Sequence, residues 1–153
     1  MALNKKKLAD SLKKIDDNKP SSKATAASKW AKAIKQHAQK GRAGDTKPTF
    51  ITELTPLFLV DMEAGIFLDK LPINLALFWQ TTIWSSASFT GVTGLANPVT
   101  LTTFLKVFSA KNLQSPAEDH TEELAGIIDS WTKTVMVVLT NNQSGATTTA
   151  PIL

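Results

Sequence analysis

The chain has 153 residues, a formal net charge of +4 and no cysteine. This length corresponds to about one domain with a core large enough to fold unaided. The lack of cysteine excludes a disulfide framework, thiolate metal ligands and a cysteine nucleophile. The first residues are basic, but an amphipathic pattern and not an apolar signal core follows them, so we expect an unprocessed, non-secreted chain.

Charge divides the chain into two chemically different parts. Residues 1–47 contain 13 of the 17 Lys and Arg and 4 of the 13 Asp and Glu, whereas residues 48–153 contain the remaining 4 and 9. Residues 71–105 carry no charged side chain at all. Burial excludes unpaired charge, so this uncharged stretch indicates a core, a subunit interface or a membrane segment.

The basic part predicts two amphipathic helices. Leu8, Leu12 and Ile15 recur at helical spacing and predict a helix over residues 4–16, which ends before Pro20. A second apolar stripe runs from Ala27 through Ile34, after a serine cap and before Gly41. Residues 41–48 then form a polar connector.

The next part is apolar on several faces, which indicates burial on several faces. We predict helices near residues 52–69 and 72–88, and we interpret Thr90–Gly94 as a turn between helices. Asn97 and Pro98 begin a further helix that ends near Ala110.

Ser115-Pro116-Ala117-Glu118 forms a capping box and predicts one more helix start. Residues 134–140 are β-branched enough to form either a helix or a strand. Residues 141–153 are rich in Thr, Asn and Gly, and we interpret them as an extended arm or loose tail.

Together these patterns predict a mainly α fold: one compact domain of about five to six helices, an extended C-terminal arm and at most one short strand near 134–140. Within it, residues 1–47 are a basic two-helix segment, residues 48–140 an apolar helical core and residues 141–153 the arm.

The titratable residues do not suggest a catalytic, cofactor-binding or metal site. His37 and His120 are the two histidines, and neither has a second histidine or a carboxylate at metal-ligand spacing beyond its own turn. Asp61, Glu63 and Asp69 stand in apolar surroundings, and we expect ion pairs across a subunit contact there rather than catalysis. The sequence therefore predicts a protein that is not an enzyme and needs no cofactor.

Membrane insertion is an alternative that the sequence disfavours. Residues 71–89 are long enough to span a bilayer, but polar side chains occur at about every third position. Trp79 and Trp84 also lie in the middle of this segment and not at its ends, where interfacial anchors belong.

Nucleic-acid binding by the basic part is a second alternative. Its lysines can neutralise phosphates, but Arg42 is its one arginine and Trp30 its one aromatic residue, so sequence-specific reading is not expected.

The chain also resembles the small structural proteins of tailed bacteriophages and prophages. The residues that carry the resemblance are Met1-Ala2-Leu3-Asn4 before Leu8 and Leu12, the block Ala27–Ile34, Phe78-Trp79 before a Gly/Thr turn, and Asp129–Val135 with the Thr/Pro-rich end. The resemblance implies a non-enzymatic virion component, assembled in the host bacterial cytoplasm. It would occur in several copies in the neck, head–tail connector or tail and contact other virion proteins.

Two sets of residues follow from this interpretation. The expected interface between copies consists of Phe78, Trp79, Ile83, Trp84, Phe89 and Ile152. The expected electropositive surface, which would lie near DNA or an acidic partner, consists of Lys5, Lys6, Lys7, Lys13, Lys14, Lys32 and Lys35. The alternatives are a membrane-active, holin-like phage protein and a basic nucleic-acid-binding accessory protein.

Overall fold

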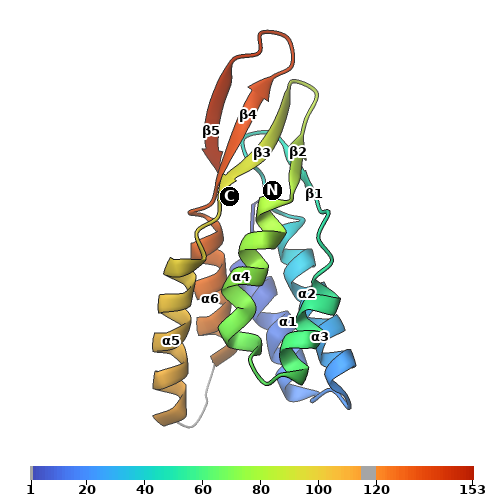
Figure 1. Cartoon of the computed structure of the whole chain (residues 1–153), viewed down its shortest axis with the longest axis vertical. Coiled ribbons are helices and arrows are strands. Elements are labelled where there is room, and N and C mark those ends of the chain that lie inside the picture. The colour runs from blue at the N-terminus through green and yellow to red at the C-terminus, as the bar shows by residue number, and fades with distance from the viewer. Residues whose placement is uncertain (1, 115–119) are drawn as a thin grey trace.

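A computed structural model describes residues 2–114 and 120–153, with the side chains of residues 110–114 also left out. Within these residues the chain forms six helices and five strands. They are α1 (Lys5–Asp17), α2 (Lys23–Ala38), β1 (Lys47–Thr49), α3 (Leu54–Glu63), α4 (Phe67–Gln80), β2 (Ile83–Ser85), β3 (Phe89–Leu95), α5 (Pro98–Gln114), α6 (His120–Thr132), β4 (Met136–Asn141) and β5 (Thr147–Pro151). The helices occupy one end of the molecule and the strands the other (Figure 1).

The fold is therefore α+β, and the prediction of a mainly α chain with at most one short strand is wrong. All five strands belong to one antiparallel sheet with the order β1-β2-β3-β4-β5. The prediction failed because residues 83–95 contain many apolar residues and no charged residue. Their sequence pattern therefore did not distinguish a strand from a helix.

The two N-terminal helices form as expected and have side-chain caps. Asn4 Oδ1 accepts a hydrogen bond from the Lys7 N–H at 3.1 Å, and Ser22 Oγ accepts one from the Thr25 N–H at 3.1 Å. Each cap satisfies one of the free N–H groups of a first helical turn. The apolar stripes of both helices are buried, with Leu8 and Leu12 on α1 and Ile34 on α2.

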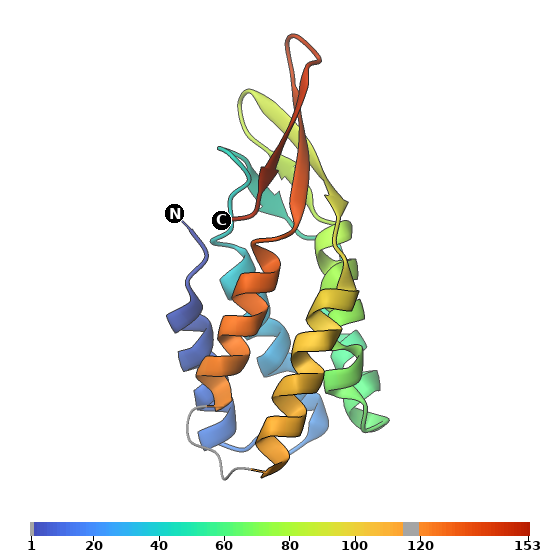
Figure 2. The same ribbon diagram turned by 90° about the vertical axis from the view of Figure 1, so that its left-hand side faces the viewer.

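The six helices form a closed bundle. Each packs against the next along the chain, and α6 packs back onto α1 (Figure 2). The described start of α6 is His120, while the predicted capping box at 115–118 lies outside the described residues.

The predicted helix 72–88 ends earlier than expected. Gly65, with a φ of 73°, separates α3 from α4, and α4 ends at Gln80. Just beyond this end, the Thr82 hydroxyl donates to the carbonyl of Phe78 at 2.7 Å. Such a local side-chain bond competes with helix continuation, and the chain turns into β2.

The predicted turn at Thr90–Gly94 is instead the middle of β3. Ser86–Ser88 connect β2 to β3, and Ser86 Oγ accepts from the Phe89 N–H at 3.1 Å. Gly91 lies on the buried face of the sheet, where an added Cβ would be 2.7 Å from Leu139 Cδ2 and 3.1 Å from Trp84 Cβ. Glycine is required here because two large side chains approach the backbone.

The C-terminal segment returns to its own chain instead of forming a free arm. Residues 147–151 pair with β4 as β5, and the hairpin they form extends farthest from the helices (Figure 2). Ile152 is fully buried and its N–H donates to the carbonyl of Val135 at 3.2 Å, while Leu153 and Arg42 exchange two backbone hydrogen bonds of 2.9 Å. The chain end is therefore part of the folded core.

Candidate interaction surfaces

The sheet has one buried and one exposed face. Trp84, Gly91 and Leu139 are direct cross-strand partners on the buried face. On the other face, a row of directly paired residues crosses all five strands, and its members are Thr49, Ile83, Val92, Val138 and Thr149. We call this exposed face the outer sheet face.

The outer sheet face is uncharged over four of its five strands. Lys47 in β1 is the one charged residue in the strands, and residues 134–153 as well as 71–105 contain no charge. Ile83, Val92 and Leu95 are all about half exposed or more. A contiguous exposed surface of this composition is typical of a site that contacts another molecule.

Exposed apolar residues also occur on the two helices next to the sheet in the chain. The Gln80 side chain at the end of α4 donates to the carbonyl of Thr93 at 3.0 Å and so fixes α4 beside β3. The exposed apolar residues on the adjoining helices are Ile73 and Leu77 on α4 and Val99, Phe104 and Val107 on α5. The uncharged segment 71–105 thus supplies both core and exposed apolar surface.

The two edges of the sheet differ in their protection. Edge strand β1 has three residues, of which Lys47 is charged and Pro48 lacks an N–H. Edge strand β5 has four consecutive uncharged residues, Thr147 to Ala150, before its proline. Charge, proline and short length block pairing with another strand, so β1 is a protected edge and β5 an open one.

Most of the residues predicted for an interface lie inside the single chain. Phe78, Trp79, Trp84 and Ile152 are buried in the core, Phe89 is partly buried, and Ile83 is exposed. Trp79 and Trp84 stack with ring centroids 5.8 Å apart, and the Trp84 indole N–H donates to Thr93 Oγ1 at 3.2 Å. Of this set, Ile83 is the residue that contributes to the outer sheet face. The sequence analysis missed Val92, Leu95 and Met136 as exposed residues of this face, because their exposure depends on how the strands pair.

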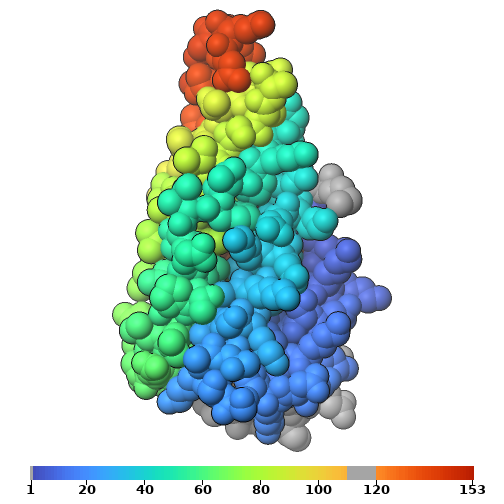
Figure 3. Space-filling model, turned by 90° about the vertical axis from the view of Figure 1, so that its right-hand side faces the viewer, coloured from blue at the N-terminus to red at the C-terminus, as the bar shows by residue number. Residues whose placement is uncertain are grey.

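The predicted electropositive residues are all exposed on α1 and α2. Those seven are Lys5, Lys6, Lys7, Lys13, Lys14, Lys32 and Lys35. Figure 3 shows these two helices side by side on one face, with α3 next to α2 and the strands narrowing above them. The basic surface therefore lies along the helical part of the molecule, and the outer sheet face lies on the strands beyond it.

A buried polar cluster lies beneath this basic surface. His37 of α2 faces α6, where its Nε2 is 3.4 Å from Asp129 Oδ1, and Lys133 Nζ is 2.9 Å from Asp129 Oδ2. Burial lowers the pKa of His37 below its ordinary value of 6.5, while the Asp129 carboxylate and the Asn4 backbone carbonyl oppose this change. The sequence could not reveal the pair, because the two residues are far apart along the chain.

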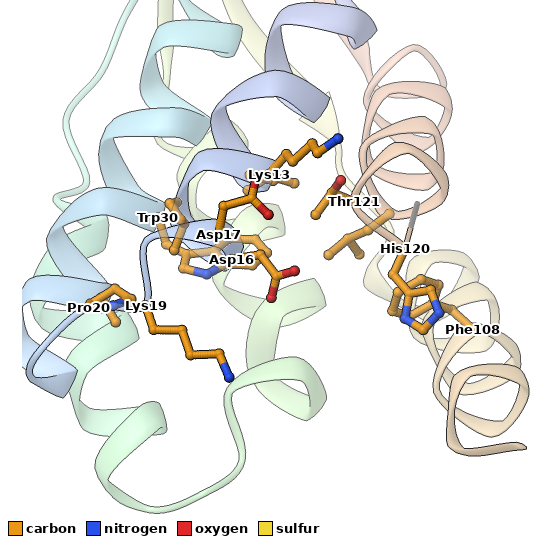
Figure 4. Close-up of a pocket in the computed structure, with 13 residues that line it drawn as sticks. Lys13, Asp16, Asp17, Lys19, Pro20, Trp30, Phe108, His120 and Thr121 are labelled. Atoms are coloured by element: carbon orange, nitrogen blue, oxygen red, sulfur yellow. The ribbon is translucent and has the colours of Figure 1, made fainter. Parts of the chain in front are cut away.

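A cavity of about 750 Å³ lies at the helical end of the molecule. Figure 4 shows Asp16 and Asp17 of α1 on one side of it and His120 of α6 on the other. Its lysines, Lys13 and Lys19, balance the two carboxylates. Residues 115–119, which separate α5 from α6 in the sequence, lie outside the described residues, and we assign the cavity no role.

The three predicted acidic candidates do not form a site. Asp61 Oδ2 accepts a hydrogen bond from Asn74 Nδ2 at 2.6 Å within the same chain, and Glu63 and Asp69 are exposed. In the described part of the chain, no group of three or more His, Asp or Glu side chains is arranged to hold a metal ion. None of the described helices is both long and apolar enough to cross a membrane.

Comparison of the chain with protein-family models, with curated protein sequences and with solved structures finds no match in any of the three.

Proposed function

We propose that the chain is a non-enzymatic structural subunit of a bacteriophage virion, present in several copies in the neck, head–tail connector or tail. The observation that carries the assembly part of this proposal is the uncharged outer sheet face. In this proposal its occupant is a second copy of the same chain.

The composition of the outer sheet face supports contact between like copies. Ile83, Val92 and Val138 form a directly paired apolar row, and burying apolar surface contributes about 25 cal/mol per Å². Each copy has a net charge of +4, and the excess of lysine lies along α1 and α2, away from the outer sheet face. Two copies therefore repel each other least when they meet at their uncharged ends.

The open edge at β5 supplies a second element of the same contact. Backbone N–H and C=O groups on an unpaired edge form hydrogen bonds with an added strand. Because Ile152 donates its N–H inward to Val135, the strand alternation turns the N–H groups of Thr147 and Thr149 outward. The absence of charge from Thr147 to Ala150 permits the same strand of a second copy to approach.

The virion part of the proposal rests on the sequence resemblance to small phage structural proteins. A subunit of that kind meets other virion proteins as well as its own copies. The exposed apolar residues of α4 and α5, which are separate from the sheet row, provide surface for such a partner.

Sedimentation of the purified chain in detergent-free buffer tests the assembly. We expect a discrete oligomer that survives high salt, because apolar contacts are not screened. Val92→Lys places a charge in the centre of the row and should shift the chain to monomer. Val60→Lys is the matched control, because Val60 on α3 is 64% exposed, Val92 is 60% exposed, and Val60 is outside this surface.

Two results would contradict the assembly through this face: a wild-type chain that is monomeric at every concentration, or equal assembly of the two variants. The virion assignment is tested separately by mass spectrometry of purified particles of the encoding phage. Its absence from those particles would reject the virion role and leave the self-assembly result standing.

A further inference from the structure

A groove runs between the first part of α1 and the last part of α2, on the side of the helical bundle nearest the sheet. Its volume is about 490 Å³, and it is lined by Asn4, Lys7, Leu8, Asp10, Ser11, Lys14, Ala33, Gln36, His37, Gln39 and Lys40. The two helices pack directly against each other, and both are at the surface in Figure 3. The groove is complete within one chain and does not depend on the proposed assembly.

Lysines occupy both walls of the groove. Lys7, Ser11 and Lys14 recur at i, i+4 and i+7 and so share one side of α1, with about 10 Å of helix between the two lysines. Lys40, two residues beyond the last residue of α2, supplies a third lysine from the side of α2. Asp10 is the one carboxylate among these lining residues, which leaves a formal charge of +2 from the side chains that surround the space.

Polar side chains without charge also line the groove. His37 is one of them, and its ring is almost fully buried against Asp129 of α6. Asn4, Ser11, Gln36 and Gln39 add amide and hydroxyl groups around it. Hydrogen-bonding groups between lysines suit a ligand with several charged oxygens.

The apolar faces of the two helices are not available to a ligand. Leu8 and Leu12 of α1 and Ile34 of α2 are buried in the core. A helix that binds a membrane surface inserts its apolar face into the lipid, so the position of these side chains disfavours a membrane. The groove also has no aromatic or arginine residue, which are the usual anchors of a protein interface, and lysine is depleted at such interfaces.

We propose that the groove between α1 and α2 binds the phosphate backbone of double-stranded nucleic acid without reading its sequence. Lysine acts as a point charge toward phosphate and releases counterions on binding. The lack of arginine forks and stacking aromatic rings matches contact with the backbone alone. The exposed lysines of α1 and α2 outside the groove extend the same positive surface.

Fluorescence anisotropy with a short labelled duplex, and with a duplex of scrambled sequence, tests this proposal across a range of salt concentrations. The groove variant carries Lys7→Gln, Lys14→Gln and Lys40→Gln. The control variant carries Lys47→Gln, Lys70→Gln and Lys106→Gln, which removes the same charge from exposed lysines that neither line the groove nor lie on α1 or α2. Circular dichroism verifies that both variants fold.

We expect the wild type to bind both duplexes equally and with an affinity that falls steeply with salt. The groove variant should reduce the slope of log K against log salt by about 3 × 0.9, roughly 2.7, and the control should leave it close to the wild-type value. Asp10→Asn, which removes the opposing carboxylate, should tighten binding several-fold.

Three outcomes would overturn the proposal: no duplex binding by the wild type at low salt, equal weakening by the two triple variants, or preferential binding to another anion. For the last, vesicles containing phosphatidylserine and a polyglutamate peptide are offered in competition with the duplex. If either competitor displaces the duplex at a lower concentration of negative charge than the duplex itself supplies, the groove binds a membrane or an acidic protein instead.

Discussion

Nε2 of His37 lies 3.4 Å from Oδ1 of Asp129, and this contact joins α2 to α6 inside the helical bundle. Lys133 holds the other carboxylate oxygen at 2.9 Å. Burial is the largest influence on the pKa of His37 and favours the neutral imidazole. His37 therefore takes up a proton less readily in the folded chain than in the unfolded chain.

This arrangement predicts that the fold loses stability in mild acid. The folded pKa of His37 is below the unfolded value of 6.5, so the unfolded chain binds more protons as the pH falls. The contribution of His37 is therefore fully present above about pH 6.5 and is lost as the pH falls from there toward the lowered folded pKa. His37→Gln should remove this part of the pH dependence.

Urea denaturation followed by tryptophan fluorescence, at about pH 7.5 and about pH 5.5, measures the effect on either side of the ordinary histidine pKa. His120→Gln is the control, because it removes the other histidine and leaves the contact with Asp129 intact. If His37→Gln and the wild type lose the same free energy of unfolding between the two pH values, His37 does not control this dependence.

A second prediction concerns the glycine on the buried face of the sheet. Gly91→Ala places a Cβ 2.7 Å from Leu139 Cδ2 and 3.1 Å from Val137 Cγ1, so side chains on β4 must move. Overpacking of this kind lowers the free energy of unfolding by about 1–3 kcal/mol.

Gly126→Ala is the matched comparison. Gly126 is inside α6, and an added Cβ there would make an ordinary contact of 3.6 Å with Lys5 Cδ. Alanine in a helix interior is favoured over glycine by about 0.5–1 kcal/mol, so this variant should be more stable than the wild type. Thermal unfolding of both variants would show the opposite signs, and a harmless Gly91→Ala would argue against the close packing of β3 on β4.

A third prediction follows from the anchored chain end. Ile152 is fully buried beside Gly41 and Val135, whereas Leu153 is 52% exposed. Ile152→Ala should lower the free energy of unfolding by about 2–5 kcal/mol, and Leu153→Ala should change it by less than about 0.5 kcal/mol. Chemical denaturation of the two variants measures these changes. If the C-terminus were a loose tail, both variants would lose the same small amount of unfolding free energy.

The sequence was sufficient to locate elements whose signals are local. The helices α1 and α2 have N-caps at Asn4 and Ser22. Each also has an apolar stripe with lysines on the opposite side, so the lysines marked the exposed side of each helix. Pro98 likewise marks the start of α5. In each case the residues that define the element are within a few positions of one another.

The sheet was not predictable by the same means, because its determinants are contacts between distant segments. Trp84 faces Gly91, and Gly91 faces Leu139, a residue on the far side of two intervening helices in the sequence. A glycine that makes room for a tryptophan has the same sequence signature as a glycine in a turn. The exposed row with Val92 at its centre, and the pairing of His37 with Asp129, depend on such contacts too.

The last prediction distinguishes the two edges of the sheet in the proposed assembly. Thr49 on β1 and Thr149 on β5 terminate the same cross-strand row, and both are exposed. Thr149→Lys introduces a charge on the open edge and should reduce the oligomer measured by sedimentation, since edge charges block strand pairing. Thr49→Lys makes the same chemical change on the same face, but at an edge that Lys47 and Pro48 already protect, so it should weaken the oligomer less than Thr149→Lys does. Equal loss of assembly in both variants would indicate that copies meet through the outer sheet face and not through β5, whereas a larger loss in Thr149→Lys assigns the strand edge to the contact.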